Sequence, residues 1–240
     1  MLLKNAFIGF LSFSILHAET LKECKSEEDK IQGCVETSNF RHYGTRETPY
    51  KNGKKDGIVK WYNQNGNLAR EIPYKDGKLE GVKKWYYGNG NLIGETPYKD
   101  NKAEGIGKEY YESGNLAQEV PYKDGKLEGV AKWYYESGNL RSETSYKNDK
   151  KEGIEKSYDE NGNLRIERSY LNDLFHGDMK YCIEDGKLLA LLKAENHEII
   201  SGKCSNNKAL TIKEIRQIDI FDTKKTINYL KEICLKSDSK

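Results

Sequence analysis

The amino-acid sequence predicts an elongated all-β repeat protein. It would be a single antiparallel sheet of stacked β-hairpins, each from a 24-residue repeat unit, with a small C-terminal helical cap. Two observations predict this fold: glycines recur every 24 residues, and tyrosines and leucines recur in step with them. A third is composition, because 36% apolar and 32% charged residues suit a body whose units pack only on their neighbours.

The first element, residues 1–18, resembles a signal peptide. Lys4 gives the positive start, residues 6–16 form an apolar run too short to span a bilayer, and Ala18 is a small residue before the expected cleavage. An N-terminal membrane anchor is the alternative. We expect a periplasmic or secreted protein with no transmembrane segment after signal removal.

Five cysteines follow, and export makes disulfides possible. None forms a CxxC pair, so a zinc site is not favoured. Cys24 and Cys34 are close in sequence and are expected to be bridged. Cys204 and Cys234 bracket the C-terminal segment and form the second expected pair, which leaves Cys182 unpaired. The sequence alone does not fix this connectivity.

The repeat array is assigned to residues 46–190, and residues 19–45 to an N-terminal cap with a degenerate copy that begins near Gly33. The glycines that open each regular copy are Gly57, Gly81, Gly105, Gly129, Gly153 and Gly177. A tyrosine and a leucine at fixed phases are predicted to form the structural core: Tyr62, Tyr86, Tyr110, Tyr134, Tyr158, Leu68, Leu92, Leu116, Leu140 and Leu164.

Each copy reads as two strands and two turns, as in residues 106–111 and 116–122 of the third copy. A three-residue loop ending in glycine places Tyr110 opposite Leu116 and Ile106 opposite Val120. It gathers the Ile/Val, both tyrosines and the leucine of each copy on one face. A two-residue loop would instead pair Lys60 with Glu71 in its own copy and scatter the apolar residues. Burial of Tyr or Leu is worth about 1.5–3 kcal/mol, more than an exposed ion pair, which favours the three-residue loop.

The last element, residues 191–240, is predicted to be a partly helical cap that closes the final hairpin. Thr211 and Glu214 have the spacing of a capping box. Asp222 precedes a segment in which Ile227 and Leu230 begin one apolar helical face.

The repeat unit reads Gly-(Ile/Val)-x-Lys-x-Tyr-Tyr-x-x-Gly-Asn-Leu-x-x-Glu-x-x-Tyr-Lys-Asp-Gly-Lys-Leu-Glu, and the stretches from Gly81 to Gly105 and from Gly129 to Gly153 follow it best. This unit resembles the bacterial variant of the MORN repeat, over roughly residues 33–190, and similar arrays occur in YwqK-family antitoxins. The resemblance implies stacked hairpins in one long sheet. Members are credited with partner binding and toxin neutralisation, and eukaryotic relatives with membrane association. The export signal departs from a cytosolic antitoxin.

Composition argues against several functions. Forty Lys and Arg balance 38 Asp and Glu, so nucleic-acid binding is not expected. The histidines His42, His176 and His197 lie at different repeat phases, and acids such as Glu71 recur in every copy, unlike a catalytic pair. The sequence shows no nucleophile motif, phosphate loop or metal-ligand spacing. We therefore expect no enzyme activity, no cofactor and no metal.

One feature predicts binding, a candidate stripe of aromatic residues at two phases of the first strand: Trp61, Trp85, Trp133, Tyr87, Tyr111 and Tyr135. Exposed aromatic rings bind peptides, glycans or partner proteins. In the alternative, the rings only pack across strands and stiffen the sheet. Glu109 and Ser157 interrupt the tryptophan phase. The prediction is a non-enzymatic extracytoplasmic scaffold for protein–protein interaction. Its alternatives are an antitoxin or immunity protein and a cell-wall carbohydrate-binding module.

Overall fold

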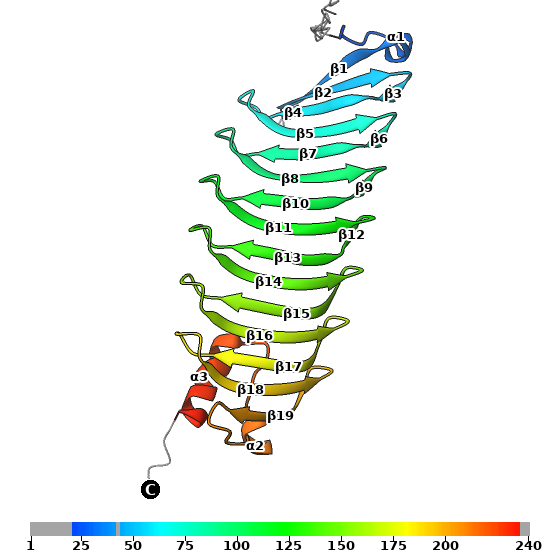
Figure 1. The fold of residues 1–240 in the computed structure, drawn as a ribbon. Helices are drawn as coiled ribbons and strands as arrows, with labels where there is room; N and C mark the ends of the chain where they lie inside the picture. Colours follow the sequence, from blue (N-terminus) through cyan, green and yellow to red (C-terminus); the bar gives the residue numbers. More distant parts are fainter. Residues whose placement is uncertain (1–20, 42–43, 236–240) are drawn as a thin grey trace, which may run out of the picture.

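A computed structural model describes residues 21–41 and 44–235. The predicted signal peptide and His42 lie outside these ranges. The chain forms one long antiparallel sheet in which consecutive hairpins stack along the long axis, with β1 at one end and β19 at the other (Figure 1). This confirms the predicted fold class. None of the helices in the described residues is long and apolar enough to cross a membrane.

The long strands pair in sequence order, with short strands at the turns between copies. Their bounds are β1 Cys34–Phe40, β2 Gly44–Lys51, β3 Lys54–Lys55, β4 Gly57–Tyr62, β5 Leu68–Lys75, β6 Lys78–Leu79, β7 Gly81–Tyr86, β8 Leu92–Lys99, β9 Lys102–Ala103, β10 Gly105–Tyr110, β11 Leu116–Lys123, β12 Lys126–Leu127, β13 Gly129–Tyr134, β14 Leu140–Lys147, β15 Lys150–Tyr158, β16 Leu164–Leu171, β17 Leu174–Cys182, β18 Leu188–Glu195 and β19 Glu198–Cys204. The helices are α1 Glu27–Gln32, α2 Ile212–Ile215 and α3 Thr223–Cys234.

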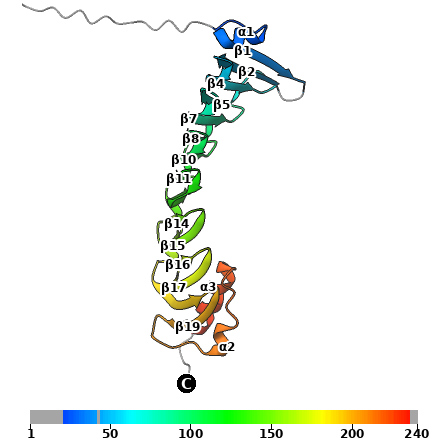
Figure 2. The same cartoon turned by 90° about the vertical axis from the view of Figure 1, so that its right-hand side faces the viewer.

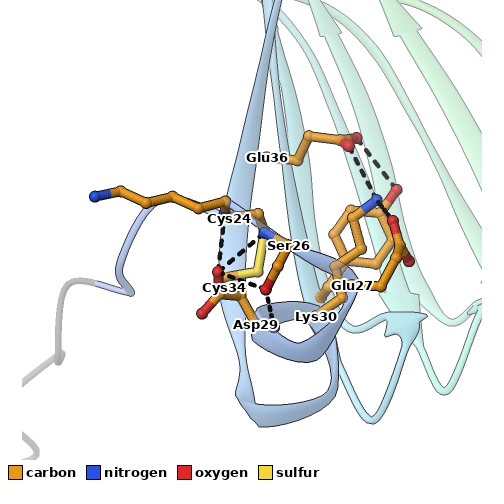
Figure 3. A network of polar contacts seen from close by, with 9 residues as sticks. Cys24, Ser26, Glu27, Asp29, Lys30, Cys34 and Glu36 are labelled. Atoms are coloured by element: carbon orange, nitrogen blue, oxygen red, sulfur yellow. Dashed lines mark hydrogen bonds and ion pairs between the residues drawn. A yellow bond between two sulfur atoms is a disulfide. The ribbon is translucent and has the colours of Figure 1, made fainter.

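The N-terminal cap protects the free edge of β1. The backbone N–H of Cys24 donates to the carbonyl of Val35, and Cys24 is bonded to Cys34 as expected. Ser26 caps α1, and the Asp29 carboxylate accepts from the backbone of Ser26 (Figure 3). The same carboxylate also accepts from the ammonium group of Lys22. The hydrogen bond from Lys22, followed by those from the backbone, lowers the pKa of Asp29 to about 2. A sheet edge is thereby closed to pairing with another chain.

Both turns of a copy follow from residues that tolerate positive φ. In the third copy, the backbone N–H of Gly114 donates to the carbonyl of Tyr111, and Gly114 has φ of 90°. The second turn is a two-residue turn in which Asp124 and Gly125 have φ of 52° and 83°, the type I′ geometry that matches strand twist. Gly33 has φ of 113°, like the opening glycines of later copies, but the hairpin of β1 and β2 has a different register: Cys34 lies opposite Tyr50, and the strands pair without a shift.

The register corrects our prediction. The three-residue loop is present and Tyr110 does pair with Leu116, but Ile106 lies opposite Pro121, not Val120. Tyr110 pairs with Leu116 and Glu109 with Gln118, so Ala117 between them has no partner and is the extra residue of a β-bulge. Beyond the bulge, each side chain of the second strand points to the face opposite to the one predicted. Lys60 therefore lies opposite Glu71 of the same copy, even though the loop has three residues.

The bulge redistributes the side chains over the two faces. We call one the tryptophan face; it carries Trp61, Trp85 and Trp133 and also the second-strand tyrosines, because Tyr122 lies over Gly107. The other, the ladder face, carries alternating lysines and glutamates with the predicted core tyrosines. Both tyrosine sets were expected on one face; the register shift separates them.

The predicted core is only partly buried. The tyrosines and leucines of that set are half-exposed on the ladder face: Tyr62, Tyr86, Tyr110, Tyr134, Tyr158, Leu68, Leu92, Leu116, Leu140 and Leu164. The Ile/Val expected beside them is still more exposed, as at Ile106 with 52%. Small residues such as Ala131 on the tryptophan face are buried instead. A single sheet has no second layer over most of its length, so side chains bury one another only sideways.

Within residues 21–41 and 44–235, a conventional core forms only at the C-terminal end, where the sheet continues past residue 190 through β18 and β19. There α3 lies against the tryptophan face (Figure 2), and Met179, Tyr181, Leu192 and Leu230 are fully buried together. Asp222 caps α3, and Thr211 with Glu214 forms the predicted capping box at α2. The second expected disulfide, Cys204–Cys234, joins β19 to the end of α3.

Candidate functional site

The predicted stripe divides into two sets with different contacts. The hydroxyl groups of Tyr87, Tyr111 and Tyr135 each donate to a backbone carbonyl of the next copy, 2.5–3.0 Å away. These three tyrosines therefore link adjacent hairpins by hydrogen bonds, in line with the alternative in which the rings only stiffen the sheet. The Asn91 amide makes a similar bond to the carbonyl of Glu112 at 3.0 Å, and Asn67, Asn115 and Asn139 make the same bond in their copies.

The ladder face is also occupied by structural contacts. The Tyr86 hydroxyl donates to the Glu71 carboxylate at 2.7 Å, and the same bond recurs in neighbouring copies. Burial, followed by this bond, raises the pKa of Tyr86 to about 12. Lys84 on β7 lies directly opposite Glu71 on β5 and Glu95 on β8. The repeated acids are therefore satisfied by their own sheet.

The tryptophans lie in a row that crosses the strands. From β2 to β7 the directly opposed residues are Arg46, Trp61, Arg70 and Trp85, so cations and indole rings alternate along the long axis of the sheet. Each member faces its neighbour across a strand pair, a distance at which side chains interact. We call these four residues the Arg–Trp row. It brings Trp61 and Trp85 together, whereas Trp133 lies farther along.

The start of the row is a packed aromatic cluster. Phe40 stacks on Trp61 with ring centres 5.4 Å apart, and the Arg46 guanidinium lies over both rings at 5.2–5.3 Å. Arg46 also donates weakly to Ser38 at 3.4 Å, while its buried Nε has no hydrogen-bond partner among the described residues. An open cavity of about 390 Å³ adjoins the cluster, lined by Phe40, Trp61 and Arg70 among others.

Beyond Trp85 the row changes character. Its indole ring lies against Gly94, where a Cβ would come within 2.5 Å of the ring. Glu109 is opposite Gly94, and Gln118 lies between Glu109 and Trp133. Ser142 and Ser157 continue the row toward the region under α3. The alternation of arginine and tryptophan is therefore confined to the N-terminal half of the face.

Sequence reasoning missed the two arginines. Arg46 and Arg70 are 24 residues apart and so share one repeat phase, while later copies have Gly94, Gln118 and Ser142 there. Under the predicted register, that phase lies away from the tryptophans. The bulge, which no residue type in the repeat specifies by itself, brings the two phases side by side.

The remaining reactive groups lie apart from this row. The Nδ1 of His197 accepts a hydrogen bond from the backbone N–H of Phe175. His176 is the residue that follows Phe175 on β17. Cys182 is a free, buried cysteine, and burial raises the pKa of its thiol. Within the described residues, no three His, Cys, Asp or Glu side chains gather in a group that could hold a metal ion.

Stacked hairpins with a varied face over a repeated framework define a β-hairpin repeat scaffold. The family model described as MORN repeat variant matches five segments of the chain: residues 55–76, 79–100, 103–124, 127–148 and 151–172. The chain is thus a scaffold of MORN-variant repeats, and hairpins of the same sheet extend beyond the matched segments at both ends. A search of curated proteins found no match.

Proposed function

We propose that this chain is a non-enzymatic extracytoplasmic scaffold that binds a protein partner through the tryptophan face between β2 and β8. The Arg–Trp row carries this proposal. Trp and Arg are the residues most often responsible for affinity in protein interfaces. The ladder face offers mainly side chains already bonded to one another, whereas Arg70 is exposed between two indole rings.

The disulfides support the extracytoplasmic part of the proposal. Cys24–Cys34 and Cys204–Cys234 each tie down one end of the sheet, and such bonds persist in oxidising compartments. Together with the predicted signal peptide, they favour the periplasm or the extracellular space. The structural contacts of the repeated glutamates and of His197 described above support a role without catalysis.

Site-specific photocrosslinking in intact cells tests the proposal. A photoreactive residue replaces Arg70 on the tryptophan face or, as the matched control, Val82 on the ladder face, which is 42% exposed. We expect a discrete crosslinked protein from position 70 and not from position 82. Crosslinks from neither position, or equally from both, would refute binding through this face.

A wall glycan is the second candidate, because the flat indole of Trp85 is a surface on which sugar rings can pack. It predicts retention on peptidoglycan that is lost when Trp85→Ala and Trp133→Ala are combined. An immunity or antitoxin role follows from the family resemblance alone. It predicts a toxin encoded nearby and rescue of cells by co-expression.

A further inference from the structure

The N-terminal half of the tryptophan face carries an excess of positive charge. Four cations lie on it: Arg46, Lys55, Arg70 and Lys83. None of them forms an ion pair with another described residue, although Lys55 lies 5.0 Å from the centre of the Tyr74 ring. Glu47 and Glu71, on the same strands, are on the ladder face. Glu36, which does share the tryptophan face, is already paired with Lys30 at 3.1 Å.

The spacing of the two arginines restricts the shape of a ligand. Arg46 and Arg70 are two strand steps apart, which is about 9.6 Å at about 4.8 Å for each step. Three residues of an extended or polyproline II chain span about the same length, at roughly 3.1–3.3 Å for each residue. In polyproline II, residues three apart also point the same way.

We propose that the Arg–Trp row binds an acidic, extended segment of a protein partner that lies along the long axis of the sheet. Carboxylates three residues apart pair with Arg46 and Arg70, and an apolar side chain between them packs on Trp61 and enters the adjoining cavity of about 390 Å³. Lys83 and Lys55 draw the acidic segment to the face. This inference rests on the proposed function and names the chemistry of the partner.

The end of the row distinguishes a short acidic segment from a long polyanion. Past Trp85, the next charged position in the row is Glu109. A uniformly charged nucleic acid or sulfated glycan that continued along the row would meet this carboxylate. A segment with only a few acids ends before it. The chain's net charge of only +2 also gives the rest of the surface little attraction for a polyanion.

Fluorescence anisotropy with the oxidised full chain tests the proposal. The probe is a labelled peptide of Asp-Pro-Pro repeats, compared with a peptide of equal charge that has Asp at every second residue and with a Lys-Pro-Pro peptide. We expect the Asp-Pro-Pro peptide to bind about tenfold more tightly than the second peptide, and the basic peptide not to bind. Binding should quench or shift the tryptophan fluorescence and weaken with salt.

Two charge reversals locate the binding site. Arg70→Glu should weaken binding of the Asp-Pro-Pro peptide by about tenfold or more, because it repels the carboxylate and breaks the alternation. Lys84→Glu makes the same change on the opposite face and should alter affinity by no more than about twofold. Circular dichroism checks that both variants keep the sheet.

Three results would overturn the inference: equal affinity for both acid spacings, equal loss in the two variants, or preference for a sulfated oligosaccharide over every acidic peptide. If position 70 still crosslinks to a protein in cells while the acidic peptides do not bind, the inference fails and the proposed function stands. If the crosslink is absent as well, both fail.

Discussion

The disulfide between Cys204 and Cys234 should hold the C-terminal cap closed. It encloses a separation of 30 residues, and the loop-closure relation gives about 3.6 kcal/mol of stabilisation for a loop of that size. Besides the disulfide, α3 is held by one buried side, which includes Ile227 and Leu230, and by the Arg168 guanidinium, which donates to the Thr223 hydroxyl at 2.7 Å. Removing the bond with Cys204→Ala and Cys234→Ala should therefore release α3 before the repeats unfold.

Hydrogen exchange measured by mass spectrometry checks this. A loss of about 3.6 kcal/mol corresponds to about 400-fold faster exchange of the α3 amides. The matched control removes Cys24 and Cys34, whose shorter loop predicts about 2.7 kcal/mol. Because each copy contacts only its neighbours, that change should leave α3 exchange unaltered. Less than about tenfold acceleration in α3, or equal acceleration in the control, would show that packing alone holds the cap.

Three further predictions concern the repeats. Glu71→Gln should lower the pKa of Tyr86 from about 12 toward its ordinary value near 10, seen as one phenolate that titrates earlier in ultraviolet absorbance. Since the folded pKa exceeds the unfolded one, the stability contributed by Tyr86 is present below about pH 10 and is lost between about 10 and 12; urea midpoints that stay constant over that range would contradict this. Gly94→Ala should destabilise the sheet by about 1–3 kcal/mol in urea titrations, because the new Cβ falls 2.5 Å from the Trp85 ring; an unchanged midpoint would show that the ring moves freely. Cys182, 3% exposed, should resist alkylation until the chain unfolds, and rapid labelling of the folded protein would refute its burial.

Local signals in the sequence were sufficient for much of the fold. The turns follow from residues with an intrinsic tolerance of positive φ, such as Gly114 and Gly125. The cap helices follow from side chains that satisfy their own first turn, as Thr211 and Asp222 do. Each of these depends on a few neighbouring residues and needs no knowledge of the partner strand.

The faces were harder to predict because they depend on a bulge at positions such as Ala117. A bulge adds one unpaired residue, and a shift of one residue reverses every side chain that follows. In a hairpin without a bulge, the apolar burial of Ile106 and the pairing of Lys60 with Glu71 exclude each other. The bulge allows the three-residue loop together with a register that places Lys60 opposite Glu71, at the expense of leaving Ile106 exposed.

The difference between repeated and varied positions separates framework from recognition in this molecule. Tyr86 and Glu71 belong to phases that recur in the five copies opened by Gly57, Gly81, Gly105, Gly129 and Gly153, and each is used to bond one hairpin to the next. The row that begins with Trp61 changes from copy to copy, through Trp85 and Glu109 to residues covered by α3. A linear scaffold of equivalent units can be specific only where its units differ, since identical surfaces would bind a ligand in several registers with equal affinity. The Arg–Trp row lies where the copies differ, which is why we place recognition there rather than on the more regular ladder face.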